Sequence, residues 1–113
     1  MRRDWELVRA LLLRLEAEES SSAHLVAQSL AGFDAEFVGY HLDLLDQAGL
    51  IVARRAGGTV VALRLTWAGH ELLDGIRRDS IWNRANGLLR EKGLEVTLDT
   101  LKLAVKAAVE AAF

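Results

Sequence analysis

The residues that could carry out chemistry are few in this chain of 113 residues, and their spacing does not assemble an active site. There is no cysteine, and the three histidines, His24, His41 and His70, are too far apart to form a compact metal-binding motif. The serine run at residues 20–22 lacks the surrounding pattern of a nucleophile motif. The glycine pair at residues 57–58 precedes a predicted strand, whereas a phosphate-binding loop leads into a helix. We therefore expect a protein that is not an enzyme and that holds neither a metal nor another cofactor.

Charged side chains are the remaining candidates for function, and they are distributed unevenly along the chain. No Lys or Arg lies between residues 15 and 53, where seven acidic residues occur, whereas ten basic and seven acidic residues follow from Arg54 onward. The net charge of −2 argues against a general binder of polyanions. Basic side chains on either side of the acidic stretch could contact phosphate groups: Arg2, Arg3, Arg54 and Arg55. Acidic side chains within it could hold a basic partner: Asp34, Glu36 and Asp43.

The spacing of apolar residues predicts two helices in the first half of the chain. One amphipathic helix is predicted from a cap at Asp4 to about residue 17. A second is predicted from a cap at Asp34 to about residue 48, where Gly49 is suited to end it. Residues 24–30 between them fit either a short helix or an extended segment, because seven residues are too few to show a period.

The second half is predicted to contain a hairpin and three helices. Two β-branched segments, residues 51–55 and 60–66, flank the glycine pair and predict strands joined by a tight primed turn. Thr66 is a suitable cap for the helix that follows, and we expect Trp67 to close the hairpin against the first helix. The helices are predicted at residues 67–78, 81–92 and 98–112.

The last predicted helix carries a narrow apolar seam with small residues toward its end. The seam consists of Leu98, Leu101, Val105, Ala108 and Ala112. Such a seam packs either on its own domain or on another chain. Because symmetric dimers are the commonest assemblies, we expect this seam to form a homodimer, with packing inside the chain as the alternative.

The order of these elements and several local motifs are typical of one fold. The residues that carry the match are His41-Leu42, the turn Ala48-Gly49-Leu50-Ile51, Gly57-Gly58, and Leu65-Thr66 with Gly69. They resemble the winged helix-turn-helix superfamily, in which a recognition helix is followed by a two-stranded wing. The resemblance implies a mostly helical α+β fold, with a winged helix and its two-stranded β-hairpin wing in residues 1–79. Residues 80–113 would form a C-terminal helical extension.

Two longer segments resemble a narrower family. They are RRDWELVRALLL at residues 2–13 and RLTWAGHELLDGIRRDSIWN at residues 64–83. Both are similar to segments of a family of short bacterial and prophage proteins that carry a domain of unknown function. The resemblance covers about residues 2–93, and it implies a fold and a genomic setting without implying any activity.

The winged-helix resemblance favours double-stranded DNA as the partner, although the predicted recognition helix is acidic. Residues 34–48 contain no Lys or Arg, so phosphate contacts must come from the arginines at the N-terminus and on the wing. Tyr40 could stack on a base or donate a hydrogen bond. Two alternatives remain open: a protein-interaction module that binds a basic partner through Asp34, Glu36 and Asp43, and a phage-encoded inhibitor that mimics DNA.

The sequence gives no indication of a membrane protein. No apolar run approaches the roughly 18 residues that a membrane span needs. The N-terminal segment begins with two arginines, but charged residues interrupt its apolar part at helical spacing and no small-residue cleavage site follows. We therefore expect a cytoplasmic protein without a membrane partner.

Overall fold

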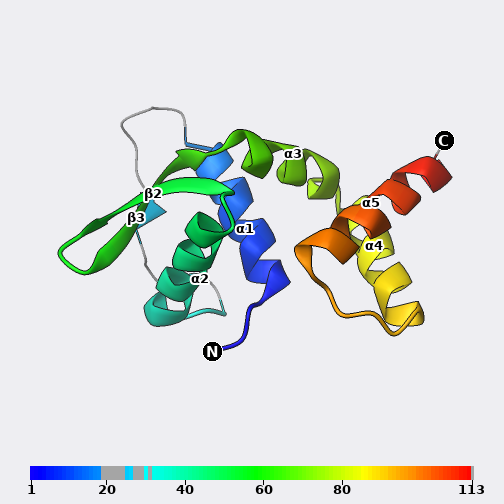
Figure 1. Ribbon diagram of the computed structural model, residues 1–113, viewed down its shortest axis with the longest axis horizontal. Helices are drawn as coiled ribbons and strands as arrows, with labels where there is room; N and C mark the ends of the chain where they lie inside the picture. Colours follow the sequence, from blue (N-terminus) through cyan, green and yellow to red (C-terminus); the bar gives the residue numbers. More distant parts are fainter. Residues whose placement is uncertain (19–24, 27–29, 31, 113) are drawn as a thin grey trace. The chain divides into compact units, whose positions relative to one another are not determined.

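The computed structural model describes residues 1–18, 25–26, 30 and 32–112 of the chain (Figure 1). By their internal contacts the residues form two compact units, Met1–His70 and Glu71–Phe113. The boundary falls within helix α3 (Trp67–Ile76). The predicted division into residues 1–79 and 80–113 stays a prediction.

The first unit combines two helices with a small antiparallel sheet, and the start of α3 follows. Its elements are α1 (Trp5–Glu16), β1 (Leu25–Val26), α2 (Ala35–Gln47), β2 (Ile51–Ala56) and β3 (Thr59–Leu65). The strand order is β1-β3-β2, so the predicted two-stranded hairpin is present and gains a third, short strand. This strand comes from the stretch at residues 24–30 whose structure the sequence left open. Of that stretch, His24 and residues 27–29 lie outside the described residues.

Both helices of the first unit begin at the predicted caps. The carboxylate of Asp4 accepts from the backbone N–H groups of Glu6 and Leu7 at 2.9 and 3.2 Å. The carboxylate of Asp34 accepts from the N–H of Phe37 at 2.8 Å. Each cap satisfies N–H groups that have no partner within the helix. The apolar faces then form the core, with buried side chains Leu7, Val8, Leu11, Leu12 and Leu15 from α1, and Val38, Leu42 and Leu45 from α2.

The hairpin turns at the predicted glycines and separates its arginines onto two faces. Gly57 and Gly58 have φ values of 58° and 82°, the left-handed conformation that a type I′ turn needs at both central positions. Arg55 pairs with Val60 in the register. The register shifts between Val52 and Ala53, so Arg64 pairs with Val52, which lies two residues before Arg54. Because paired residues and alternate residues of a strand share a face, Arg54 and Arg64 lie on one face and Arg55 lies on the other.

Thr66 joins the end of α2 to the start of α3. Its hydroxyl donates to the carbonyl of Gly49 at 2.6 Å and accepts from the N–H of Gly69 at 3.0 Å, and its own N–H donates to the carbonyl of Leu50 at 3.0 Å. Gly49 ends α2 with a φ of 75°. We call these four residues the Thr66 clasp. A Cβ atom on Gly69 would lie 2.0 Å from the carbonyl oxygen of Leu50, so the clasp requires glycine there.

The second unit consists of the later part of α3 with α4 (Asp79–Glu91) and α5 (Leu98–Ala112). Helix α5 has the predicted bounds, and Thr97 caps it by accepting from the N–H of Thr100 at 3.1 Å. Helix α4 begins two residues before its predicted start. Asp79 and Ser80 lie within the helix, and Arg78 is the N-cap residue.

Gly69→Ala is expected to destabilise the first unit by about 1–3 kcal/mol or more, because the added methyl group meets backbone that cannot move without breaking the clasp. Chemical denaturation followed by circular dichroism measures the change. Gly87→Ala is the matched control: Gly87 lies within α4 with nothing near its missing Cβ, so the same change there should stabilise by roughly 0.5–1 kcal/mol. Equal effects of the two substitutions would contradict the role assigned to Gly69.

Candidate nucleic-acid interface

The N-terminal arm is attached to α2 through a buried histidine. Nε2 of His41 accepts from the backbone N–H of Asp4 at 2.7 Å, and Nδ1 lies 2.9 Å from the carbonyl oxygen of Phe37. A carbonyl can only accept, so the ring proton is on Nδ1 and the imidazole is neutral in this arrangement. The ring is fully buried, so His41 is part of the core of the first unit. The bond to Asp4 was not predicted, and it anchors the chain directly after Arg2 and Arg3.

The hairpin contacts α2 through an ion pair. The guanidinium of Arg55 donates to the carboxylate of Asp43, which also accepts from Nε2 of Gln47 at 2.9 Å. The bond from Arg55 is the main reason that the pKa of Asp43 lies below its usual value. In turn, Asp43, with a smaller contribution from Asp46, raises the pKa of Arg55. The guanidinium is therefore held against an acidic helix, although 60% of its side chain stays exposed.

These two contacts attach the N-terminal arm and the hairpin to opposite sides of α2. His41 and Asp43 are two residues apart, which is about 200° around an α-helix. Asp4, where the N-terminal arm is attached, therefore lies on one side of α2, and the hairpin lies on the other (Figure 1). The sequence predicted each basic group separately but not this arrangement.

The predicted phosphate-binding arginines are all exposed, and one of them is also engaged by an aromatic ring. The guanidinium carbon of Arg3 lies 4.7 Å from the ring centroid of Trp5, within the range of a cation–π contact. Arg2 and Arg54 are exposed. Tyr40 is half-buried, with its ring edge-on to His41 at a centroid distance of 5.6 Å.

The three predicted partner-binding acids differ in what they already contact. Asp34 is exposed, and its carboxylate caps α2. Glu36 is exposed in the first turn of the same helix. Asp43 binds Arg55, so a residue assigned to a protein partner and a residue assigned to DNA are bound to each other. That pairing reduces both the negative charge that α2 presents and the positive charge that the hairpin presents.

The predicted dimer seam on α5 is only partly at the surface of the chain. Leu101 and Ala108 are fully buried in the single chain, Leu98 and Val105 are half-buried, and Ala112 is exposed. Among the described residues of the second unit, the large apolar side chains that are exposed are Leu94 and Leu103, which the seam did not include. Leu103 lies next to the predicted seam on α5. The sequence does not show that α4 leaves it uncovered, because that depends on where α4 packs.

Trp67 is 82% exposed, so the prediction that it closes the hairpin against the first helix was wrong. It occupies the first position of α3, where its ring is exposed, whereas Thr66 directly before it turns inward to cap the helix.

Among the described residues, no group of three or more His, Cys, Asp or Glu side chains is placed to hold a metal ion. Within the same residues, no helix is both long and apolar enough to cross a bilayer.

The fold and this surface define a small, mostly helical α+β protein with a layout compatible with that of winged helices. Residues 2–95 match the model of a family described as "Hypothetical protein (DUF2513)", and the chain belongs to that family. An "Uncharacterized protein" of Haemophilus influenzae is 42% identical over 106 residues, which cover 90% of each chain. No solved structure matches the sequence. The predicted resemblance to a family of unknown function is confirmed.

His41→Phe is expected to loosen the N-terminal arm, because it leaves the N–H of Asp4 without its acceptor while nearly keeping the ring volume. The cost should be about 1–3 kcal/mol of stability, with faster amide hydrogen exchange in the first turn of α1. His70→Phe is the control, since that histidine is exposed. Unchanged exchange at Asp4 in the His41 variant would refute the assigned anchor.

Proposed function

We propose that this protein is a non-enzymatic winged-helix protein that binds double-stranded DNA. Helix α2 would enter the major groove, and the N-terminal arm and the hairpin would contact the phosphates on either side. The observation that supports this proposal best is that the N-terminal arm and the hairpin, which both carry arginines, are attached to opposite sides of α2. A role on DNA implies a cytoplasmic location in a bacterial cell, as the sequence predicted.

The charges support binding that depends strongly on salt. Strands β2 and β3 together carry three arginines and no acid, with Arg54 and Arg64 on one face of the hairpin and Arg55 on the other. Arginines on a wing bind phosphates without reading sequence, and their contribution falls as salt rises. The acids of α2 oppose this attraction, although a carboxylate can accept a hydrogen bond from the amino group of cytosine.

Asp43 has a particular part in this proposal, because it competes with phosphate for Arg55. The ion pair lies at the surface, where such pairs contribute little to stability. A DNA phosphate could therefore replace the carboxylate of Asp43 as the partner of Arg55 at small cost. Asp43 would then set how much affinity the hairpin contributes.

A second candidate is a protein-interaction module that uses the acidic side of α2. It is favoured by the exposure of Asp34 and Glu36 on a helix without Lys or Arg. The reading as a phage-encoded DNA mimic would use the same surface. Glu36→Lys should abolish capture of a basic partner without removing the cap, whereas Arg54→Ala should leave that capture unchanged.

Fluorescence anisotropy of a labelled random duplex, at low and near-physiological salt, tests the first proposal. Arg54→Ala and Arg55→Ala should each weaken binding and reduce the salt slope by about one. Arg90→Ala is the matched control, because it removes an exposed arginine from α4 of the second unit. Failure to bind at low salt, or equal losses in all three variants, would contradict the proposed interface.

Asp43→Asn is expected to raise the affinity for the duplex above that of the unaltered protein, because Arg55 is released. Glu36→Gln removes one negative charge from the same helix without releasing an arginine, so it measures the effect of charge alone. The same anisotropy titration compares the two variants. If both raise the affinity equally, competition by Asp43 is excluded and only the net charge of α2 matters.

A further inference from the structure

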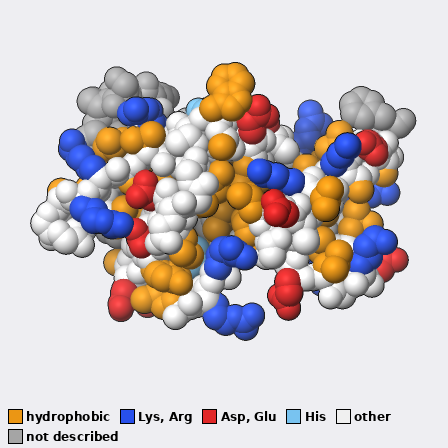
Figure 2. Space-filling view, in the orientation of Figure 1, with side chains coloured by type: hydrophobic (Ala, Val, Ile, Leu, Met, Phe, Trp, Pro, Cys, Tyr) orange, Lys and Arg blue, Asp and Glu red, His pale blue; other side chains and the backbone are white. Residues whose placement is uncertain are grey.

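The second unit has an apolar groove at its surface, between α4 and α5. Its volume is about 270 Å³, and its lining includes Leu88, Leu94, Leu103 and Ala107, with Lys92 at its edge. Leu103 is 69% exposed and Leu94 is 50% exposed. Figure 2 shows hydrophobic side chains at the surface of this part of the chain, between charged ones. Two large exposed side chains that share a groove favour a covering partner.

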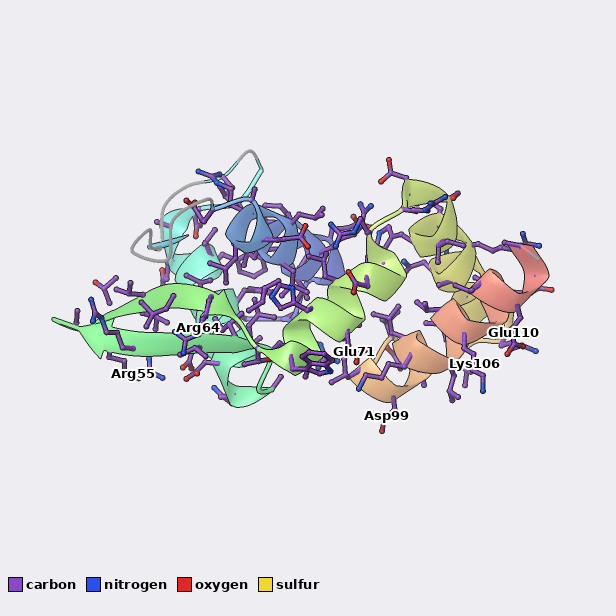
Figure 3. All side chains as sticks on the ribbon, turned by 90° about the horizontal axis from the view of Figure 1, so that it is seen from above. Arg55, Arg64, Glu71, Asp99, Lys106 and Glu110 are labelled. Carbon is purple, nitrogen blue, oxygen red and sulfur yellow. The ribbon has the colours of Figure 1, made fainter. Side chains whose placement is uncertain are left out.

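The charges beside the groove indicate what that partner is. Asp99 lies four residues before Leu103 on α5, and Lys106 lies three residues after it, so all three share one face of the helix. Figure 3 labels both charged residues on α5. Across the described parts of the chain, neither of them forms an ion pair. The face therefore presents an acid, a leucine and a base in that order.

This order is complementary to itself when two such helices run in opposite directions. In an antiparallel pair centred near Leu103, each Asp99 faces Lys106 of the other helix, and the two leucines meet at the axis. A parallel pair would place like charges together, which is unfavourable. The small side chain of Ala107, on the same face, allows the two helices to approach closely.

We propose that α5 of a second copy of the chain covers this groove, packed antiparallel about a two-fold axis near Leu103. Leu103 of each copy enters the groove of the other beside Leu94, and two symmetry-related ion pairs join Asp99 to Lys106. A two-fold interface of this kind uses the same patch on both copies. It differs from the predicted seam, whose Leu101 and Ala108 are buried in the single chain.

The contact is small, so the dimer depends on protein concentration. Helix α5 has 15 residues and is about 22 Å long, which limits the area that one helix pair buries. Stable interfaces bury roughly 1,200–2,000 Å² in total. The dimer does not rest on the proposed DNA binding and is measured without DNA, so either proposal can fail alone.

Sedimentation equilibrium of the full chain over a range of concentrations tests the inference. The unaltered protein should reach the mass of a dimer. Asp99→Lys and Lys106→Asp should each raise the dissociation constant by about tenfold or more, because like charges then face each other. The double variant should restore the dimer, because the two charges are exchanged. Leu103→Gln should abolish it.

Arg90→Asp is the matched control for the charge changes. It reverses an exposed arginine on α4 that lies two residues from the groove residue Leu88 and therefore about 200° around that helix from it. Its dissociation constant should stay close to that of the unaltered protein. A monomer at every concentration, failure of the double variant to restore the dimer, or an equal effect of Arg90→Asp would overturn the proposal.

Discussion

The hydrogen bonds of Thr66 determine where the hairpin stands relative to α2. β3 ends at Leu65, and the next residue binds the carbonyl of Gly49 directly after α2. The same hydroxyl begins α3, and the absence of a side chain on Gly69 lets that helix start against the backbone of Leu50. The end of the hairpin is thereby held at the end of α2, and Arg55 on the hairpin reaches Asp43 of that helix. The ion pair between Arg55 and Asp43 follows from this geometry.

Helix α2 is held on its two sides by contacts of different physical character. The bond from Asp4 to His41 is formed by a neutral ring that is fully buried, so dissolved salt hardly affects it. The bond from Arg55 to Asp43 is at the surface, where salt screens it and a competing anion can replace it. The N-terminal arm is therefore a constant part of the surface. The hairpin arginine can exchange its partner.

The features that the sequence predicted are those in which one residue type determines its own local backbone. Asp4 and Asp34 cap helices, and Gly57 and Gly58 turn the hairpin, because those side chains suit those conformations wherever they occur. The contacts of His41 with Asp4 and of Asp43 with Arg55 join residues 37 and 12 positions apart, so no local pattern indicates them. The exposure of Trp67 and Leu103 likewise depends on where other elements pack, and the periodicity of one helix gives no information about that.

The arm, α2 and the hairpin together form the proposed surface for duplex DNA. The most direct measurement is the change in backbone amide chemical shifts when a short duplex is added to the isotope-labelled protein at low salt. The largest changes should fall at residues 2–4, on the exposed side of α2 and along residues 54–59, and they should diminish as salt is added. Changes confined to α4 and α5, or no changes at low salt, would contradict it.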